Sequence, residues 1–341
     1  MIRSDAGKNV KLTRKAAGIV LIMLIVGAVM LSLCWGSYEI SPKEVLAVFL
    51  GQGEKMQNTA ILGIRLPRVL VGMAVAAALS TAGCILQTMT KNELADPGII
   101  GINAGGAVAA VLFIQLQTTA YYSELGNASV FVLPFMAIAG SFTAALGIYL
   151  LSGRKKLRPK RLLLMGIGVN AGLNAFLTVF TFRGGVGDYN KILIWTTGSL
   201  WGAGWSYAKV LLPLVMAVSV YVLWKSRMMD AMNFLDETAI GWGIPVERER
   251  RKMLLSAVVL AGAATAFAGN IGFLGLISPH IAKKLVGPSH RYHIPVSAGI
   301  SMVILLTSDA VSRNLFSPIE IPAGITVSIV GVPYFIYLMM K

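Results

Sequence analysis

Residues 65–106 read RLPRVLVGMAVAAALSTAGCILQTMTKNELADPGIIGINAGG and indicate how the chain folds. Two arginines bracket Pro67, and about twenty uncharged residues follow, the length that a helix needs to cross a bilayer. The turn Asp96-Pro97-Gly98 then leads into a second apolar run. Small residues crowd both runs, and small residues let helix backbones approach closely inside a membrane. The stretch therefore predicts two spans that pack against protein.

Composition indicates a polytopic membrane protein. Hydrophobic residues make up 56% of the 341 residues and charged residues only 13%, which is too apolar for a soluble fold of this length. The net charge of +15 lies in short clusters between apolar runs, as in cytoplasmic loops, and this pattern argues against nucleic acid as a partner. Cys34 and Cys84 both lie in apolar runs, so no disulfide framework is expected.

Hydropathy divides the chain into a basic cytoplasmic N-terminus, residues 1–15, and one transmembrane domain, residues 16–341. The first run follows a basic segment, as in a signal peptide, but it is about twenty residues long and lacks a good cleavage site, so we expect a retained span. The ten predicted spans are 16–35, 69–89, 98–116, 128–151, 162–182, 207–224, 253–268, 271–286, 294–310 and 321–340.

The stretch 253–286 could hold one helix or two, and the distribution of basic residues decides between them. Two helices, with the N-terminus inside, place 22 of the 30 Lys and Arg residues on the cytoplasmic side. One fused helix places only 19 there. The positive-inside rule therefore favours ten spans with both termini in the cytoplasm. Between the first two spans, Ser41-Pro42-Lys43-Glu44 predicts the start of a short external amphipathic helix.

The chain carries no motif for an energy source of its own. It has no phosphate-binding loop, and no Asp or Glu falls in the middle of an apolar run, as an ion-coupled carrier would require. Asp309 comes closest, and we expect it to cap a helix or to pair with Arg313. His280, His290 and His293 share one inner loop without further ligands, so no metal site is predicted.

Residues 225–252 form the longest predicted cytoplasmic segment. Asp230–Leu235 can form one short helix and Asp236–Gly241 the start of another, closed at Gly243-Ile244-Pro245. Two short helices at a membrane-anchored end suit a mobile partner, although an ordinary solvated loop fits the composition equally well.

Four stretches in the same order resemble the FecCD-type permeases, the iron-siderophore and cobalamin branch of the ABC importers. The stretches are RLPRVLVGMAVAAALSTAGCILQ (65–87), NELADPGIIGINAGG (92–106), DETAIGWGI (236–244) and FAGNIGFLGLISPHIAKKLVGPSHR (267–291). The resemblance implies a type II ABC importer permease-like bundle in the cell membrane, surrounded by lipid. It also implies a second permease subunit, identical or closely homologous, two cytoplasmic ATPase subunits and an extracytoplasmic substrate-binding protein. ATP and Mg would be bound by the ATPases, and this chain would hold no cofactor.

The resemblance also implies roles for individual residues. Arg65, Arg68 and Arg313 would dock the binding protein, although arginines that snorkel to the interface are the alternative. The segment that couples to the ATPase would include Asp230, Leu235, Glu237, Gly241, Gly243 and Ile244. Gly272, Gly275, Pro279 and His280 match a family motif, and we expect His280 to cap or pack.

We expect small and weakly polar residues to line the translocation path, namely Ser80, Thr81, Gln87, Asn103, Asn170 and Asn174. The expected substrate is an iron(III)-siderophore complex, with cobalamin or haem as alternatives within the family. An ion-coupled secondary carrier and a structural or signalling subunit are the alternatives from other classes. Selectivity in this family lies largely in the binding protein, so the sequence leaves the particular chelate open.

Overall fold

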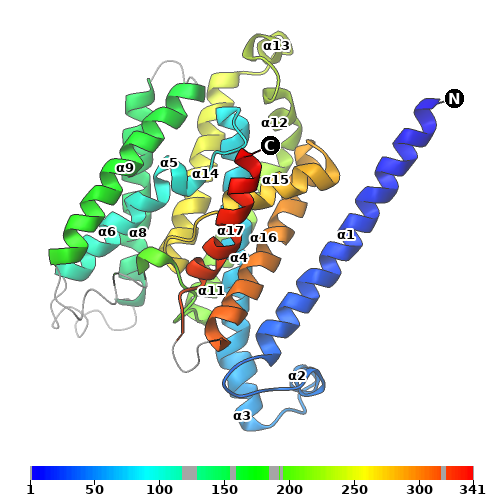
Figure 1. The fold of residues 1–341 in the computed structure, drawn as a ribbon, viewed down its shortest axis with the longest axis vertical. Helices are drawn as coiled ribbons and strands as arrows, with labels where there is room; N and C mark the ends of the chain where they lie inside the picture. The colour runs from blue at the N-terminus through cyan, green and yellow to red at the C-terminus, as the bar shows by residue number, and fades with distance from the viewer. Residues whose placement is uncertain are drawn as a thin grey trace.

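We describe the chain from a computed structural model, and the structure describes residues 2–116, 129–153, 159–183, 192, 195–315 and 320–340. Each of the ten predicted apolar runs contains one longer helix (Figure 1). These helices are α1 (Ile2–Cys34), α4 (Leu66–Thr90), α6 (Ile102–Leu116), α8 (Ser129–Ser152), α9 (Pro159–Arg183), α11 (Trp205–Trp224), α14 (Val246–Ala268), α15 (Leu274–Val286), α16 (His290–Asn314) and α17 (Ala323–Met339). Within the described residues, seven helices are long and apolar enough to cross a membrane, and α6 and α17 are shorter apolar helices. The predicted all-α multi-pass bundle is confirmed.

The stretch 253–286 holds two helices, as the charge distribution predicted. α14 ends at Ala268, residues 269–273 are not helical, and α15 begins at Leu274. α15 lies within the predicted run 271–286 but is shorter, with 13 residues. At 1.5 Å per residue it is roughly 20 Å long, which is less than the thickness of the hydrocarbon core.

The predicted third span, 98–116, is also interrupted. Pro97 begins a single helical turn, α5 (Pro97–Ile100), and the Asp96 carboxylate caps it by accepting a hydrogen bond from the backbone N–H of Gly98 at 2.7 Å. Gly101 ends this turn with a φ of 93°, which glycine adopts without strain, and α6 follows at Ile102. The chain therefore changes direction where hydropathy predicts one continuous helix.

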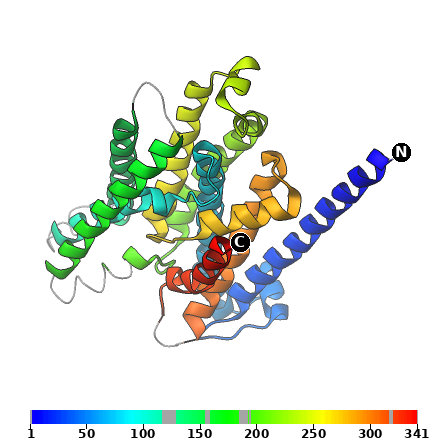
Figure 2. The ribbon, with the colours of Figure 1, turned by 45° about the horizontal axis from the view of Figure 1, so that its top comes forward.

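α4 forms the centre of the bundle. It contacts α11, α14, α15 and α16, and nearly every residue between Val69 and Thr90 is buried. α8 and α9 lie on one side of this centre and α1 leans away on the other (Figure 2). α1 exposes apolar side chains such as Ile19 and Ile22, as a helix that faces lipid does. The prediction that the first span of 65–106 packs against protein is confirmed.

Short helices mark the two ends of the bundle (Figure 1). α2 (Pro42–Phe49), α3 (Lys55–Asn58) and the π-helical turn Thr59–Arg65 lie at one end, the α2 end. α12 (Ser226–Met232) and α13 (Asp236–Gly241) lie at the opposite end, the α13 end. α2 confirms its predicted start, since the Glu44 carboxylate accepts from the backbone N–H of Ser41 at 2.7 Å in a capping box.

Candidate functional site: a polar cavity between two polar ends

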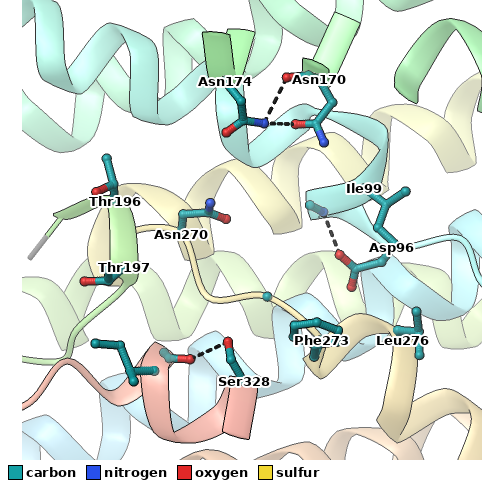
Figure 3. A pocket seen from close by; sticks show the side chains of 14 residues that line it. Asp96, Ile99, Asn170, Asn174, Thr196, Thr197, Asn270, Phe273, Leu276 and Ser328 are labelled. Atoms are coloured by element: carbon teal, nitrogen blue, oxygen red, sulfur yellow. Dashed lines mark hydrogen bonds between the residues drawn. The ribbon is translucent and has the colours of Figure 1, made fainter. Parts of the chain in front are cut away.

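A cavity of about 440 Å³ opens among α5, α9, α15 and α17, where two non-helical segments meet (Figure 3). Its lining consists of Asp96, Gly98, Ile99, Asn170, Asn174, Thr196, Thr197, Asn270, Gly272, Phe273, Leu276, Gly324, Ile325 and Ser328. Backbone hydrogen bonds hold residues 195–198 against both the non-helical segment 269–273 and the start of α17: the N–H of Asn270 donates to Trp195 O at 3.3 Å, and that of Gly324 in α17 donates to Gly198 O at 2.9 Å. Irregular backbone at membrane depth is tolerated where it lines such a cavity.

Amides and hydroxyls dominate the polar part of the lining. The Asn174 Nδ2 donates to Asn170 Oδ1 at 2.8 Å, and the Ser328 hydroxyl donates to Gly324 O at 2.8 Å (Figure 3). Asp96 supplies a carboxylate, and no Lys, Arg or His of the described residues lines the cavity. Such a wall offers hydrogen bonds with little charge.

The structure brings only part of the predicted path together at this cavity. Asn170 and Asn174 line it, and Asn103 lies behind the wall, where its Nδ2 donates to Asn270 Oδ1 at 3.2 Å. Ser80 and Thr81 are buried inside the bundle and do not line the cavity. Gln87 reaches the carbonyls of Gly275 and Leu276 at 3.4 Å and lines a separate cavity near the α13 end.

Sequence reasoning missed most of the cavity wall, since only Asn170 and Asn174 of its lining residues were predicted. Thr196 and Thr197 precede the sixth predicted span, Asn270 and Phe273 lie in the break between α14 and α15, and Ser328 lies on α17. The predicted division of 253–286 into two helices was the one available signal of a break at membrane depth, and Asn270 lies in that break.

The predicted docking arginines gather at the α2 end, and their guanidinium groups bond within the chain. Arg68 binds Asp309 at 2.9 Å and Glu320 at 3.2 Å, with the Arg68 side chain 12% exposed. Arg313 donates to the carbonyls of Ser32 and Trp35, both at 3.0 Å. Asp309 was expected to cap a helix or to pair with Arg313, and it pairs instead with Arg68, whose guanidinium reaches this carboxylate from the neighbouring helix.

Arg65 is the most enclosed of the three arginines. Its side chain donates to Leu33 O at 2.5 Å, to Cys34 O at 3.2 Å and to Tyr38 O, and the residue is only 6% exposed. These carbonyls belong to the end of α1 and the turn that follows it. Arg65 thus fastens the α1–α2 connection to the start of α4.

The predicted coupling loop contains two short helices, as expected, with different bounds. The first is Ser226–Met232 in place of the predicted Asp230–Leu235, and it begins immediately after α11. The second, Asp236–Gly241, starts where predicted, and Gly243 follows with a φ of 79°. The loop ends at Pro245, because residues 246–252 already belong to α14.

Most of the predicted coupling residues of this loop are exposed. Glu237 and Gly241 are exposed, and Ile244 is partly buried. Two large apolar side chains, Leu235 and Trp242, are exposed as well.

Ion pairs hold this coupling segment to the bundle. The Asp236 carboxylate accepts from Lys91 at 2.9 Å and from Arg250 at 3.0 Å. Burial raises the pKa of Asp236, but the hydrogen bonds from Lys91 and Arg250 outweigh that effect and hold the pKa below its ordinary value. Asp236 therefore stays ionised at neutral pH and joins α13 to the ends of α4 and α14.

Asp230, the other acidic residue of the segment, faces the bundle. Its carboxylate accepts from the backbone N–H of His290 at 2.8 Å, from His290 Nδ1 at 2.6 Å and from the Ser289 hydroxyl at 3.2 Å. His290 in turn contacts Thr88 Oγ1 through Nε2 at 2.7 Å. His280 lies apart, 3.5 Å from the Glu93 carboxylate. The described residues contain no cluster of three or more His, Cys, Asp or Glu that could hold a metal ion.

A multi-pass bundle with a weakly polar cavity at membrane depth defines a membrane transport protein. The chain belongs to the FecCD transport family, whose model matches residues 22–341. It is 46% identical to the iron(3+)-hydroxamate import system permease protein FhuG of Bacillus subtilis (strain 168), over 94% of this chain and 96% of that protein. It is 34% identical to the hemin transport system permease protein HmuU of Yersinia pestis, over 82% and 83% of the two chains. Its fold matches a metal-chelate type ABC transporter solved in an inward-facing conformation, with a TM-score of 0.81, 26% identity and coverage of 95% and 98%. It is an ABC importer permease.

Proposed function

We propose that this permease passes an iron(III) hydroxamate chelate across the cell membrane. The charge of the cavity wall carries the proposal. Asp96 supplies one carboxylate to the wall, the other polar side chains are amides and hydroxyls, and none of the described lining residues is basic. Three hydroxamate groups, each with one negative charge, neutralise iron(III), so the chelate enters without net charge to desolvate. A citrate or catecholate chelate stays anionic and would face Asp96 without a compensating cation. The hydroxamate importer relative supports the same substrate class.

A second permease subunit, identical or closely homologous, would complete the path. α9 and α17 carry cavity residues, Asn174 and Ser328, and both helices also expose large apolar side chains, Leu164 on α9 and Ile329 on α17. A partner helix bundle that covers these faces would close the cavity and bury the apolar surface. Energy would come from two ATPase subunits that hold ATP and Mg. They would receive the exposed residues of the α12–α13 segment, including Leu235 and Glu237.

The α13 end would face the cytoplasm together with both termini, since this orientation puts most basic residues inside. The α2 end would then face outward and receive the binding protein. Arg65, Arg68 and Arg313 lie there, and glutamates of a docking protein could replace carbonyl or carboxylate partners that these arginines now hold. Arg68 is the best placed, because its partner Glu320 is partly exposed.

The substrate is tested by uptake of radiolabelled iron in cells lacking this chain and in cells with it restored. We expect deletion to lower uptake of a neutral iron(III) hydroxamate at least about tenfold, and the restored chain to recover it. Uptake of ferric citrate, labelled cobalamin and haem, measured alongside, should be unchanged. Loss of cobalamin or haem uptake with hydroxamate uptake intact would overturn the substrate. Normal uptake of all four would overturn the transport role.

The cavity is tested by a matched pair of variants at Asn174. Asn174→Lys places an ammonium group beside Asn170, while Asn174→Gln keeps the amide. We expect the lysine variant to lower uptake of a positively charged hydroxamate chelate about tenfold more than uptake of a neutral one, because like charges repel. The glutamine variant should treat both chelates alike. An equal loss for the two chelates in the lysine variant would contradict a path through this cavity.

Docking is tested at the Arg68–Glu320 pair, whose two members should have opposite effects. We expect Arg68→Gln to weaken binding of the substrate-binding protein about tenfold, and Glu320→Gln to strengthen it, since Glu320 competes for the same guanidinium. Binding to the permease complex in nanodiscs, measured at low and high salt, gives both affinities and their salt dependence. Equal affinity for both variants would contradict docking through Arg68.

A further inference from the structure

Three side-chain contacts join α4 to α16 along the full length of the pair. Thr88 Oγ1 meets His290 Nε2 at 2.7 Å near the α13 end, and the Ser80 and Ser297 hydroxyls meet at 2.5 Å farther along. Arg68 binds Asp309 at 2.9 Å at the α2 end. The two helices run antiparallel, and the first and last contacts are twenty residues apart on α4, or roughly 30 Å. The pair therefore reaches from one polar end of the bundle to the other.

These contacts are buried, which makes them costly to break. His290, Ser80, Ser297 and Asp309 are each at most 3% exposed. A buried polar group that loses its partner cannot turn to water, so a sliding motion between α4 and α16 would leave several such groups unpaired. Packed interfaces of this kind move as units between discrete arrangements.

The coupling segment is attached to the same pair at the α13 end. Asp230 of α12 accepts two hydrogen bonds from His290, the first residue of α16. Lys91, which follows the last residue of α4, donates to Phe234 O at 2.8 Å and to Asp236 at 2.9 Å. The α12–α13 segment is therefore bound to one end of α4 and to one end of α16.

We infer that α4 and α16 move as one body, and that His290 is the positioning residue that fastens the coupling segment to it. The inference rests on the proposed function, in which the α13 end receives the ATPases and the α2 end receives the binding protein. A displacement of α12 would then move the α4–α16 pair, and with it Arg68 and Asp309 at the α2 end. By reciprocity, an event at the α2 end would reach the ATPases through the same contacts.

The test uses the complete complex with its ATPase and binding protein in proteoliposomes, with radiolabelled iron(III) hydroxamate as substrate. His290→Gln keeps a polar group near Thr88 and removes the Nδ1 contact with Asp230, while Asp230→Asn keeps the shape and removes the charge. We expect His290→Gln to hydrolyse ATP without binding protein within about twofold of wild type. Stimulation by the loaded binding protein, and uptake, should fall about tenfold. His280→Gln, outside the α4–α16 contacts, is the matched control and should behave as wild type.

A double-variant cycle tests whether the two ends share one connection. If α4 and α16 carry the signal, His290→Gln combined with Asp309→Asn should lose no more stimulation than the stronger single variant. The inference would be overturned if the loss of stimulation in the double variant equalled the product of the two single losses. Stimulation at the wild-type level in His290→Gln, or a parallel fall of its basal hydrolysis, would also overturn it. Wild-type complex that hydrolyses ATP on stimulation but fails to transport the hydroxamate would instead overturn the proposed substrate.

Discussion

Gly83→Ala is expected to leave little folded permease in the membrane, although alanine is the smallest side chain that can be added. Gly83 lies in the middle of α4, and a Cβ there would meet the backbone of Gly275 at the start of α15, with Cα at 2.7 Å and the carbonyl carbon at 2.6 Å. Real Cβ atoms essentially never approach this closely, and the backbone of α15 cannot turn aside as a side chain would.

Relief of that clash would require α15 to move off α4. α15 also carries Leu276, which lines the cavity, so its displacement would alter the site itself. Overpacking of this kind costs about 3 kcal/mol, and more where backbone must shift, against a total stability of about 5–15 kcal/mol for a typical domain. We therefore expect a strong fall in the amount of protein in the membrane fraction and in the melting temperature of the purified complex.

Gly147→Ala on α8 is the matched control. Gly147 also lies inside a helix, but a Cβ there would have no atom within 4 Å. Alanine favours helix over glycine by up to about 1 kcal/mol, so this variant should be as stable as wild type or slightly more stable. Equal melting temperatures for the two alanine variants would show that α4 and α15 are not packed backbone against backbone.

The fold was predictable to the extent that it depends on hydropathy, small residues and charge. The small residues of 65–106 predicted a protein-packed helix, and α4 is that helix. Basic residues predicted the division between α14 and α15. What sequence could not reveal was which helix each glycine faces, since Gly83 meets α15 through a contact that spans nearly two hundred residues of chain.

The site was harder to predict for a physical reason. Polarity identifies a residue that avoids lipid, but the same polarity serves a cavity wall and a contact between helices. Asn174 and Ser80 look alike in this respect, yet Asn174 lines the cavity and Ser80 bonds to Ser297 inside the bundle. Residues 195–204 and 269–273 bring Thr196 and Asn270 to the wall, and their placement depends on backbone hydrogen bonds between distant parts of the chain.

Arg65→Gln is expected to loosen the whole α2 end before any partner binds. The guanidinium holds three carbonyls, those of Leu33, Cys34 and Tyr38, and Gln can reach at most part of this set. Buried acceptors that lose a charged donor cost about 3–5 kcal/mol together. The α1–α2 connection should become sensitive to protease, and the melting temperature should fall. Lys55→Gln, at an exposed position of the same end, should change neither property.

Arg65→Lys separates this fastening role from a docking role. Lysine keeps the positive charge but presents one compact ammonium group in place of a planar fork, so it cannot hold carbonyls at both ends of the turn. If Arg65 acts mainly as a fastener, the lysine variant should resemble the glutamine variant in protease sensitivity and melting. If Arg65 acts mainly by charge toward the binding protein, the lysine variant should bind it normally and melt as wild type. The burial of Arg65 favours the first result, and a stable, fully binding lysine variant would contradict it.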